Sequence, residues 1–575
     1  MKFLYRYVKP FAGIMLVGLF IKTIGTMSEL ALPYILSYIL DEIVKSDGRI
    51  SMIVLWGCLM IFFALLALAC NVKANRMASK VSRDCTENVR HDLFYRTMTL
   101  SGHQIDTFTI PSLESRITTD TYNVQNFINR IQRLGVRAPI LLFGGMIVTL
   151  VMDSYLSLVM FGVLPAIFLV TLFVSRIGVR LYTGVQKAVD NMIRVVREDS
   201  QGIRVIKALS KAKKEHQRYD QVNQKLVRAE RKAGLVMGSA NPIMDLLMNL
   251  GIIFVVLLGA YRVMGRQTQP GKIVAFTQYF TMISTALISV TRMFMMYTKF
   301  SASAIRIKEV VDAPMGLTPL SEKKYPPINE EGYLVLDDVS FAYPNSKETL
   351  QHISFSLPRR SSLGIIGATG SGKTTLINLI MRLYDVDSGA VRIKGRDIRT
   401  IPEEELHHIF GIAMQNDFLY SDTIEENISF GRDLPHESVV RAAKIAQADD
   451  FIMSFSKGYT YVLNQKATNL SGGQKQRILI ARALAADPDI LILDDSSSAL
   501  DYKTDAALRQ AIARHHNDAT QIIVAQRVSS VKSCDQILVL EEGKILGLGD
   551  HEHLMKTCEV YREISESQMG GNFVE

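Results

Sequence analysis

A glycine-rich run in the second half of the chain has the residue types that bind phosphate groups. It reads Gly367-Ala-Thr-Gly-Ser-Gly-Lys-Thr. Glycines let backbone N–H groups approach phosphate oxygens, and a helix that starts at the end of such a run adds the positive end of its dipole. We expect Lys373 to reach the β- and γ-phosphates of a nucleoside triphosphate, and the hydroxyl of Thr374 to bind Mg²⁺. The predicted contacts of this loop, the P-loop, are Gly367, Thr369, Gly370, Ser371, Gly372, Lys373, Thr374 and Thr375.

The carboxylate that completes such a site follows an apolar strand. The run Ile490–Leu493 is typical of a buried strand, and Asp494 comes directly after it. P-loop ATPases place a second Mg²⁺-organising carboxylate there. Another apolar strand, Ser362–Ile366, leads into the P-loop, and a helix is expected from Thr375 onward. Strand, loop and helix in this order predict an α/β core that binds ATP with Mg²⁺.

A second motif follows further along the chain. Leu470-Ser-Gly-Gly-Gln474 is continued by Lys475-Gln-Arg. Together with the P-loop, and in this order, the string resembles the signature of ATP-binding cassette (ABC) proteins. In that family ATP lies between two cassettes, with the P-loop of one facing the signature of the other. The resemblance implies that one chain alone closes neither site. The residues expected to contact ATP held by a second cassette are Ser471, Gly472, Gly473 and Gln474.

Other positions match the same family residue by residue. Tyr343 resembles the aromatic residue that stacks on adenine, and a tyrosine of the hydrophobic core is the alternative. Gln415 matches the glutamine that senses the γ-phosphate and Mg²⁺, so the resemblance implies a place for it at both the catalytic and the metal site. Ser498-Ala-Leu-Asp501 matches the loop that links the two ATP sites of a dimer.

Three features depart from the family pattern. The residue after Asp494 is normally a glutamate that polarises the attacking water; here it is Asp495. Its side chain is one methylene shorter, and a displacement of about 1 Å can cost on the order of 10²-fold in rate. The switch histidine is replaced by Gln526, which donates a hydrogen bond but cannot carry a positive charge or accept a proton. In the turn before the signature, Gln465 replaces a glutamate and both glycines are absent. With Asp495, Gln526 and Gln415 as its catalytic positions, the site is predicted to bind ATP and hydrolyse it poorly.

This combination resembles the degenerate-site subunit of heterodimeric multidrug ABC exporters. In such pairs a second, different half-transporter supplies the catalytic glutamate, the switch histidine and a damaged signature. The resemblance implies ATP-driven export of a hydrophobic or amphipathic small molecule. Two alternatives stay open: a homodimeric lipid or peptide exporter with slow ATPase, and a regulatory or gating subunit that pumps nothing.

The first half of the chain has the composition of a membrane domain. Hydrophobic residues make up 48% of the 575 residues, and the mean hydropathy is +0.15. Apolar stretches of about 20 residues cross roughly 30 Å of hydrocarbon. The predicted fold is a membrane all-α domain with six transmembrane helices and long intracellular helical loops, followed by an α/β P-loop ATPase domain of the ABC type. The six spans are expected near 11–40, 51–72, 135–153, 156–175, 242–263 and 273–297.

The distribution of positive charge predicts the orientation. Lys and Arg number 65 against 56 Asp and Glu, for a net charge of +9. Many of these cations lie in two long polar gaps between spans, at 73–134 and 176–240. By the positive-inside rule both gaps face the cytoplasm, so the cations indicate membrane topology and no nucleic-acid partner. We expect a multi-pass protein of the plasma membrane with a cytoplasmic nucleotide-binding domain.

Each long gap contains a string that resembles an intracellular loop of exporter-type ABC proteins. The strings are Ser112-Leu-Glu-Ser-Arg-Ile-Thr-Thr-Asp-Thr and Gln201-Gly-Ile-Arg-Val-Ile-Lys-Ala, and the resemblance implies short coupling helices that dock on the cassettes. Ionisable residues within the spans, such as Lys22 and Glu29, either line a translocation cavity or pair between helices. We predict a transmembrane domain at 1–312, a proline-rich linker at 313–330 and a nucleotide-binding domain at 331–575.

Overall fold

The computed structural model describes residues 2–44, 50–320, 332–344, 346–414, 418–496 and 498–569. The chain divides into two compact units. The first is made of Met1–Thr97 and Pro111–Asp312, and the second of Met98–Ile110 and Ala313–Glu575. The short stretch Met98–Ile110 thus belongs to the second unit, although it lies inside the predicted transmembrane domain. Much of the predicted linker lies outside the described residues, and the domain boundaries stay predictions.

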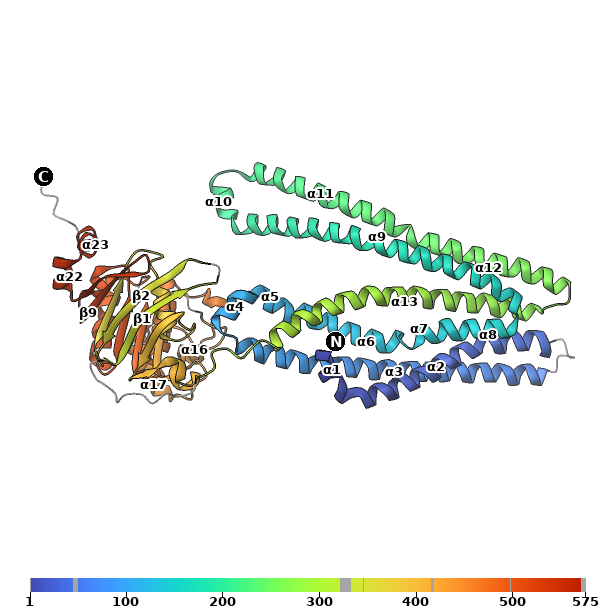
Figure 1. Ribbon diagram of the computed structural model, residues 1–575, viewed down its shortest axis with the longest axis horizontal. Helices are drawn as coiled ribbons and strands as arrows, with labels where there is room; N and C mark the ends of the chain where they lie inside the picture. Colours follow the sequence, from blue (N-terminus) through green and yellow to red (C-terminus); the bar gives the residue numbers. More distant parts are fainter. Residues whose placement is uncertain are drawn as a thin grey trace. The chain divides into compact units, whose positions relative to one another are not determined.

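The described part of the first unit is built of helices (Figure 1). Segments η2, η3 and η4 are short π-helical turns, and η1 is a 3₁₀ turn. In chain order the segments are α1 (Lys2–Val8), η1 (Lys9–Phe11), α2 (Ala12–Tyr38), η2 (Ile39–Ile43), α3 (Ile50–Met98), α5 (Ile110–Ser115), η3 (Arg116–Asp120), α6 (Thr121–Leu134), α7 (Arg137–Pro139), η4 (Ile140–Gly144), α8 (Gly145–Met152), α9 (Ser154–Gln201), α10 (Ile203–Ala208), α11 (Ala212–Gly238), α12 (Ala240–Met264) and α13 (Pro270–Val311).

Six helical stretches in the described chain are long and apolar enough to cross a membrane, so the predicted fold of the first domain is confirmed. Several are much longer than a bilayer requires. The 49 residues of α3 span about 74 Å at ~1.5 Å per residue, against a hydrocarbon core of roughly 30 Å. The polar loops of the sequence therefore continue the helices beyond the membrane. The stretches are Phe3–Ile43, Ile50–Met98, Ile110–Met152, Ser154–Gln201, Ala212–Met264 and Pro270–Val290.

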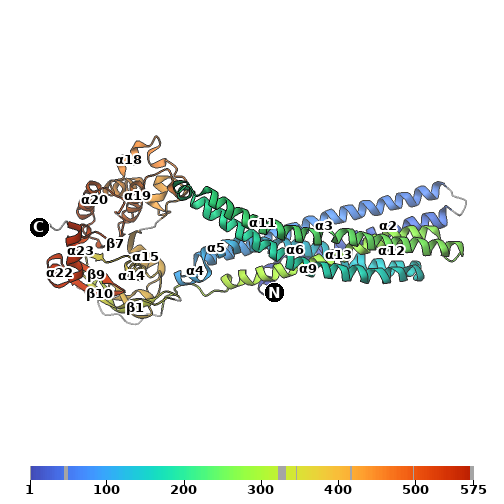
Figure 2. The ribbon, with the colours of Figure 1, turned by 90° about the horizontal axis from the view of Figure 1, so that it is seen from above.

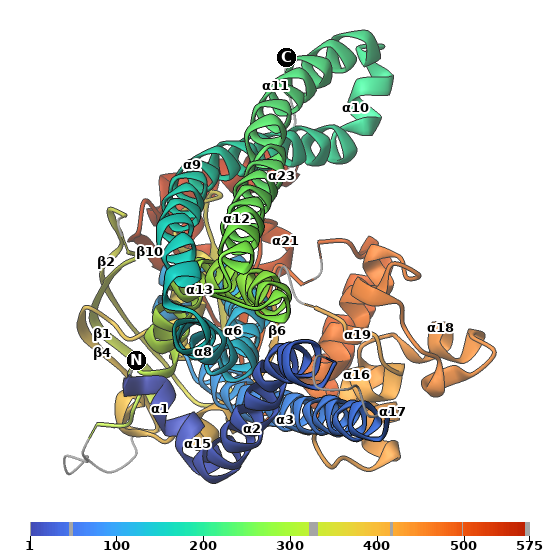
Figure 3. The same ribbon diagram turned by 90° about the vertical axis from the view of Figure 1, so that its right-hand side faces the viewer.

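Helices α9 and α11 form a long hairpin that turns at α10. They lie side by side (Figure 1), and the tip of the hairpin lies well away from α3 and α6 within the same unit (Figure 3). Helix α10 contains most of the second predicted loop string and has no buried residue. Its Ile203 and Val205 are exposed, as is Leu209 after it. The second intracellular loop therefore presents apolar side chains on the surface of this unit.

Helix α13 carries the largest fully buried side chains of the first unit. Phe276, Tyr279, Phe280 and Ile283 pack in one cluster with residues of α8 and α9. The hydroxyl of Tyr279 donates a hydrogen bond of 2.6 Å to the carbonyl oxygen of Leu30. These contacts join α2, α8 and α9 to α13.

The ionisable residues predicted within the first span pair with neighbouring helices. Lys22 Nζ donates to Asn71 Oδ1 at 2.6 Å, and Asn71 Nδ2 donates to Glu29 Oε1 at 2.8 Å. Arg137 donates to the other oxygen of Glu29 at 3.1 Å. Lys22 and Glu29 were predicted either to line a translocation cavity or to pair between helices, and these contacts favour pairing between helices.

The described part of the second unit contains two β-sheets. In the larger, of order β10-β9-β3-β8-β7-β6, the strands from β9 to β6 are parallel and β10 is antiparallel; the smaller, of order β2-β1-β4-β5, is antiparallel. Because β8 lies between β3 and β7, the carboxyl ends of the two predicted strands meet at one edge. The strands are β1 (Leu334–Ala342), β2 (Glu348–Leu357), β3 (Ser362–Ile366), β4 (Ser388–Ile393), β5 (Arg396–Asp397), β6 (Phe410–Ala413), β7 (Ile490–Asp494), β8 (Thr520–Val524), β9 (Gln536–Glu541) and β10 (Lys544–Gly549).

Helices cover these sheets and form a separate side of the unit. Figure 2 shows α18, α19 and α20 gathered on one side and β1, β9 and β10 on the other. Helix α4 (Gly102–Phe108) also belongs to this unit. The remaining helices are α14 (Lys373–Ile380), η6 (Ile398–Thr400), α15 (Glu403–His408), α16 (Ile424–Ser429), α17 (His436–Ile445), α18 (Asp449–Ser454), η7 (Gly458–Thr460), η8 (Gln465–Ala467), α19 (Gly472–Leu484), α20 (Tyr502–His515), α21 (Val528–Val531), α22 (His551–Thr557) and α23 (Glu559–Met569).

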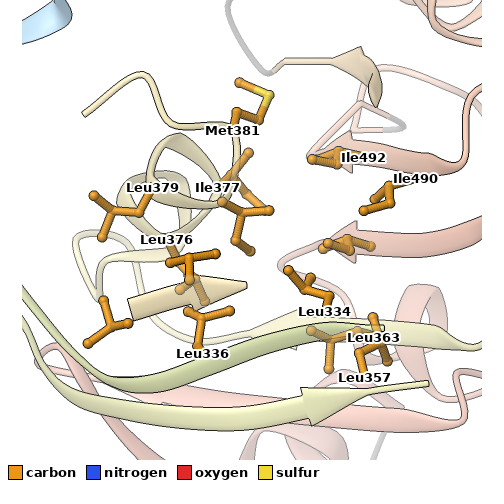
Figure 4. Packing of buried hydrophobic residues seen from close by; sticks show 14 of the residues in the cluster. Leu334, Leu336, Leu357, Leu363, Leu376, Ile377, Leu379, Met381, Ile490 and Ile492 are labelled. Atoms are coloured by element: carbon orange, nitrogen blue, oxygen red, sulfur yellow. The ribbon is translucent and has the colours of Figure 1, made fainter. Parts of the chain in front are cut away.

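Three hydrophobic clusters stabilise the described part of the second unit, and the third joins β9 to α21, α22 and α23. In the first, residues of β1, β3 and β7 pack against α14; Figure 4 shows Leu336, Leu363, Leu376 and Ile492 among them. The second lies under α16, α17 and α19. The sheets with α14 therefore share one core, and the helical side has its own, which confirms the predicted α/β ATPase domain.

Helix α4 packs on the cassette ahead of the first predicted loop string. Tyr384 Oη donates to Asp106 Oδ2 at 2.8 Å, and Gln104 donates to the carbonyl oxygen of Pro314 at 3.1 Å. A Cβ atom at Gly102 would lie 2.7 Å from the Tyr384 ring, so the approach requires glycine. The string itself lies in the first unit, where the buried Arg116 forms an ion pair with Glu309 at 2.9 Å.

Candidate functional site

The P-loop connects the end of β3 to the start of α14, as the sequence predicted. Gly370 and Gly372 have φ values of 85° and 103°, which side chains other than glycine rarely adopt. A Cβ atom at Gly372 would also lie 2.7 Å from Leu350. These two glycines therefore let the loop turn tightly enough for α14 to begin at Lys373 with its free N–H groups facing the loop.

A cavity of about 280 Å³ lies between the P-loop and the ends of β7 and β8. It brings together many of the predicted residues. Its described lining is Thr349, Thr369, Gly370, Gly372, Lys373, Thr374, Thr375, Asp494, Asp495, Val524, Ala525 and Gln526. Thr349 was not predicted, because a threonine in a strand carries no local signal; β2 brings it there.

Two predicted P-loop residues do not line this cavity. A Cβ atom at Gly367 would lie 2.1 Å from the Leu540 carbonyl oxygen, so this glycine permits a close approach to β9. The Ser371 side chain is buried, and its hydroxyl has no hydrogen-bond partner in the described structure. The close approach of Gly367 shapes the loop, and the predicted contacts of Gly367 and Ser371 with ATP stay predictions.

The polar side chains of the cavity are arranged for a phosphate and a hard cation. Lys373 Nζ donates to the carbonyl oxygens of Gly367 and Ala368 at 2.8 and 2.7 Å, and burial lowers the pKa of Lys373. Thr374 Oγ1 donates to Asp494 Oδ2 at 3.2 Å. Burial raises the pKa of the Asp494 carboxyl, while the Thr374 hydrogen bond opposes this change.

The oxygen ligands of Thr374 and Asp494 fit Mg²⁺, which binds few protein oxygens and completes its shell with substrate phosphates. Among the described residues, no group of three or more His, Cys, Asp or Glu side chains could hold a metal. The two oxygen ligands of Thr374 and Asp494 fit a cation whose other ligands come from a nucleotide and water. Gln415, the third predicted metal ligand, lies outside the described residues.

Asp495 and Gln526, the two departures from the family pattern that are predicted to be catalytic, contact each other. Gln526 Nε2 donates a hydrogen bond of 3.1 Å to Asp495 Oδ2. Burial raises the pKa of the Asp495 carboxyl, and the charge of Lys373 opposes this change. The loop of Gln526 is held by Gln568 of α23, which donates to the Gln526 carbonyl oxygen and accepts from the Val528 N–H, both at 2.8 Å. Sequence reasoning missed Gln568, which has no motif around it.

The signature residues lie at the start of α19 and do not line this cavity. Ser471 caps the helix: its hydroxyl accepts from the Gln474 N–H at 3.3 Å, and the Gln474 side chain accepts from the Ser471 N–H at 2.9 Å. A Cβ atom at Gly473 would lie 3.1 Å from the Ala499 carbonyl oxygen, while one at Gly472 would make ordinary contact. The described chain therefore separates its P-loop cavity from its signature.

The loop Ser498–Asp501 is tied to the signature helix of the same chain. Gln476 Nε2 donates to Ser498 Oγ at 3.2 Å, and Gln476 Oε1 accepts from the Ala499 N–H at 3.0 Å. Asp501 caps α20 by accepting from the Thr504 N–H at 2.9 Å, which lowers the pKa of the carboxyl. Gln476 is thus a second positioning residue that sequence reasoning missed.

Tyr343 and the turn before the signature lie outside the cavity. The ring of Tyr343 packs edge-on against Phe341 and Tyr384, so it belongs partly to the core; its predicted contact with adenine stays a prediction. In the turn before the signature, Lys466 and Ala467 have φ values of 59° and 48°. The family pattern has a glycine at the position of Ala467. The turn keeps a left-handed conformation without that glycine.

Comparisons with known proteins agree with this architecture. Residues 15–287 match the model of the ABC transporter transmembrane region, and residues 350–498 match the ABC transporter model. The chain is 35% identical to the uncharacterized ABC transporter ATP-binding protein YfiB of Bacillus subtilis over 98% of both chains. It is 28% identical to the ATP-dependent lipid A-core flippase of Vibrio parahaemolyticus, over 99% of this chain and 98% of the flippase.

A solved structure has the same fold. The structure of a bacterial Atm1-family ABC exporter with ATP bound aligns with a TM-score of 0.79 over 98% of both chains, at 23% identity. This likeness concerns the fold alone.

Proposed function

Because this chain belongs to the ABC transporter family and carries the fused membrane and ATP-binding domains of an exporter half-transporter, we propose that it exports a hydrophobic or amphipathic small molecule as one half of a heterodimer. Its own P-loop site binds ATP and hydrolyses it slowly. A different half-transporter carries the catalytic glutamate and the switch histidine. The complex lies in the plasma membrane.

The observation that carries this proposal is the contact at the catalytic position. Gln526 donates to an oxygen of Asp495, the carboxylate that would polarise the attacking water. The side chain of Asp495 is a methylene shorter than the family's glutamate, and Gln526 cannot accept a proton as the family's histidine can. Both changes weaken hydrolysis and leave the phosphate-binding part of the cavity unchanged.

The residues of this chain have separate tasks in such a site. The N–H groups of the P-loop bind phosphate oxygens, and Lys373 balances their charge. Thr374 and Asp494 would hold Mg²⁺, which neutralises phosphate charge when bound. Ser471, Gly472 and Gly473 act on the ATP of the partner, with the dipole of α19 directed at its γ-phosphate. Slow hydrolysis at this P-loop keeps ATP as a long-lived clamp, and hydrolysis at the partner's P-loop resets the transporter.

The name of one relative supports an amphipathic substrate. The Vibrio relative is named as a flippase of a lipid, and six apolar spans provide a path between leaflets. A gating subunit that only controls a pore is the second candidate, which a slow ATP site also permits. Transport by reconstituted vesicles separates the two, because a pump accumulates substrate against a gradient when ATP is supplied and a gate only dissipates one.

Co-purification tests the heterodimer directly. The tagged chain is purified in detergent from its native membrane, and its partners are identified by mass spectrometry. We expect a second, different half-transporter at one-to-one, with the catalytic glutamate, the histidine and an altered signature. Recovery of this chain alone as a dimer would overturn the heterodimer and favour the slow homodimeric exporter.

A further inference from the structure

A polar cavity of about 660 Å³ lies between α3 and α6 in the first unit. Cations from both helices line it: Arg76, Lys80 and Arg83 come from α3, and Arg133 comes from α6. The described lining contains no Asp or Glu. Side chains far apart in the sequence thus direct positive charge into one space.

The charges of this cavity are largely uncompensated. Arg83 pairs with the neighbouring Asp84 at 2.8 Å. For Arg76, Lys80 and Arg133 the described structure records no ion pair. Like charges around one space repel each other, and a surface lined by charges of one sign attracts an anion. A solvated helix face would explain exposed cations on α3 alone, but not the half-buried Arg133 that faces the same space from α6.

Two asparagines add hydrogen-bonding groups to the cavity. Lys22 Nζ donates to Asn75 Oδ1 at 3.3 Å, which leaves the amide N–H₂ of Asn75 as a donor. Asn129 Nδ2 donates to Ser79 Oγ at 3.5 Å, while its buried Oδ1 has no donor within the described structure. A ligand that carries both an anion and a hydroxyl or amine donor would satisfy these groups.

An apolar stripe on α3 leads to the cavity. Ile61, Leu65, Leu68 and Val72 are each 40% to 61% exposed. Their spacing of four, three and four residues places them on one face of the helix, and Arg76 continues that face. The surface therefore changes from apolar to cationic along one line, which matches a hydrocarbon chain joined to an anionic headgroup.

We propose that the α3–α6 cavity binds the anionic, phosphate-type headgroup of an amphiphile whose hydrocarbon chain lies along the Ile61–Val72 stripe. This inference rests on the proposed export function and deepens it by naming the substrate class. The amphiphile has a single hydrocarbon chain and comes either from the membrane or from solution. In both cases its recognised group is a phosphate monoester on an alkyl chain.

Binding is measured without ATP, so that the result does not depend on transport or hydrolysis. The purified complex in neutral detergent is titrated with dodecyl phosphate and followed by native mass spectrometry. We expect the combined variant Arg76→Gln, Lys80→Gln and Arg133→Gln to bind at least about tenfold more weakly, because charged hydrogen bonds are lost. Lys73→Gln is the matched control, since Lys73 lies on α3 but does not line the cavity; its affinity should stay within about twofold. If the combined variant does not fold, the single substitution Arg133→Lys is measured instead. It keeps the positive charge and should retain binding.

Three comparisons can overturn the proposal. Unchanged binding by the combined variant and by Arg133→Gln would remove the site. Equal binding of dodecylphosphocholine would show that the net negative charge of the headgroup is not recognised. If inorganic phosphate competed for the cavity as well as dodecyl phosphate does, the hydrocarbon chain of the amphiphile would contribute nothing to binding.

Proteoliposomes distinguish a transported amphiphile from a resident lipid. We expect ATP-dependent accumulation of dodecyl phosphate, lost in the combined variant and kept in Lys73→Gln. Binding without accumulation, while another substrate is pumped, would refute the substrate assignment and leave the export function intact. Binding without any ATP-driven transport would refute the export function instead.

Discussion

The P-loop cavity and the signature helix belong to one cassette but differ in how far they follow the family pattern. At the signature, Ser471 and Gln474 form a complete helix cap, and Gln476 ties the helix to the Ser498–Asp501 loop. At the P-loop cavity, the glycine-rich loop, Lys373 and Thr374 follow the family pattern, but Asp495 and Gln526 depart from it and hydrogen-bond to each other.

This difference separates two tasks that a symmetric transporter would combine in each chain. In the proposed heterodimer, the signature acts on ATP held by the other cassette, while the catalytic position acts on ATP held by its own. Substitution at one and preservation at the other is therefore what a half-transporter needs if it activates its partner's site and clamps its own.

Ser471→Arg should have the largest effect. A bulky side chain at the helix cap removes the hydroxyl and blocks the approach of a γ-phosphate, so we expect the ATPase of the assembled complex to fall about 10²-fold, in the range seen when a preorganised donor is lost. Ser471→Thr keeps a hydroxyl cap and should retain most activity. An ATPase rate unaffected by Ser471→Arg would mean that the signature does not act on a catalytic site.

The double substitution Asp495→Glu with Gln526→His should raise hydrolysis at this chain's site. It restores the missing methylene and a side chain that can accept a proton, so we expect a gain of about tenfold or more in single-turnover hydrolysis, since ~1 Å of misplacement costs up to about 10²-fold. ATP affinity is the control and should change little. If the double variant hydrolysed ATP no faster, the slow hydrolysis at this site would have another cause than residues 495 and 526.

Gln476→Ala should have an intermediate effect. Loss of its two hydrogen bonds to the Ser498–Asp501 loop costs about 1–2 kcal/mol at ~1 kcal/mol each, and we expect a several-fold fall in ATPase of the complex. Gln476→Glu keeps the acceptor for the Ala499 N–H, so its ATPase rate should lie between those of the wild-type complex and Gln476→Ala. Nucleotide binding at the P-loop of this chain should be unaltered, because Gln476 does not line that cavity.

Asp495→Asn should have the smallest effect. The amide has nearly the same shape, and a site that contributes little hydrolysis loses little, so the steady-state ATPase of the complex should stay within about twofold. A large loss would show that Asp495 is a working catalytic base and would contradict the weak-site proposal.

Local patterns predicted the elements that carry the ATP site. Six long apolar stretches predicted six spans, because a bilayer fixes the length of a helix that crosses it. The P-loop and the strands before it and at 490–493 were predicted from glycines and apolar runs that act over a few residues. The functions of Gln568, Thr349 and Gln476 could not be predicted in this way, since each depends on a contact with a residue distant in the sequence.

The assignment of helix α4 to a domain also depends on contacts between residues that are distant in the sequence. Its sequence is continuous with the membrane helices, yet Asp106 and Gln104 bond residues of the cassette. The sequence by itself determined the family, the number of spans and the two departures at positions 495 and 526. Only the tertiary structure decided that these two side chains bond each other, that α4 belongs to the cassette, and that Arg133 shares a cavity with cations of α3. The reason is physical: hydrophobic length, glycine conformation and motif chemistry act locally, whereas side chains from separate elements meet only when packing brings those elements together.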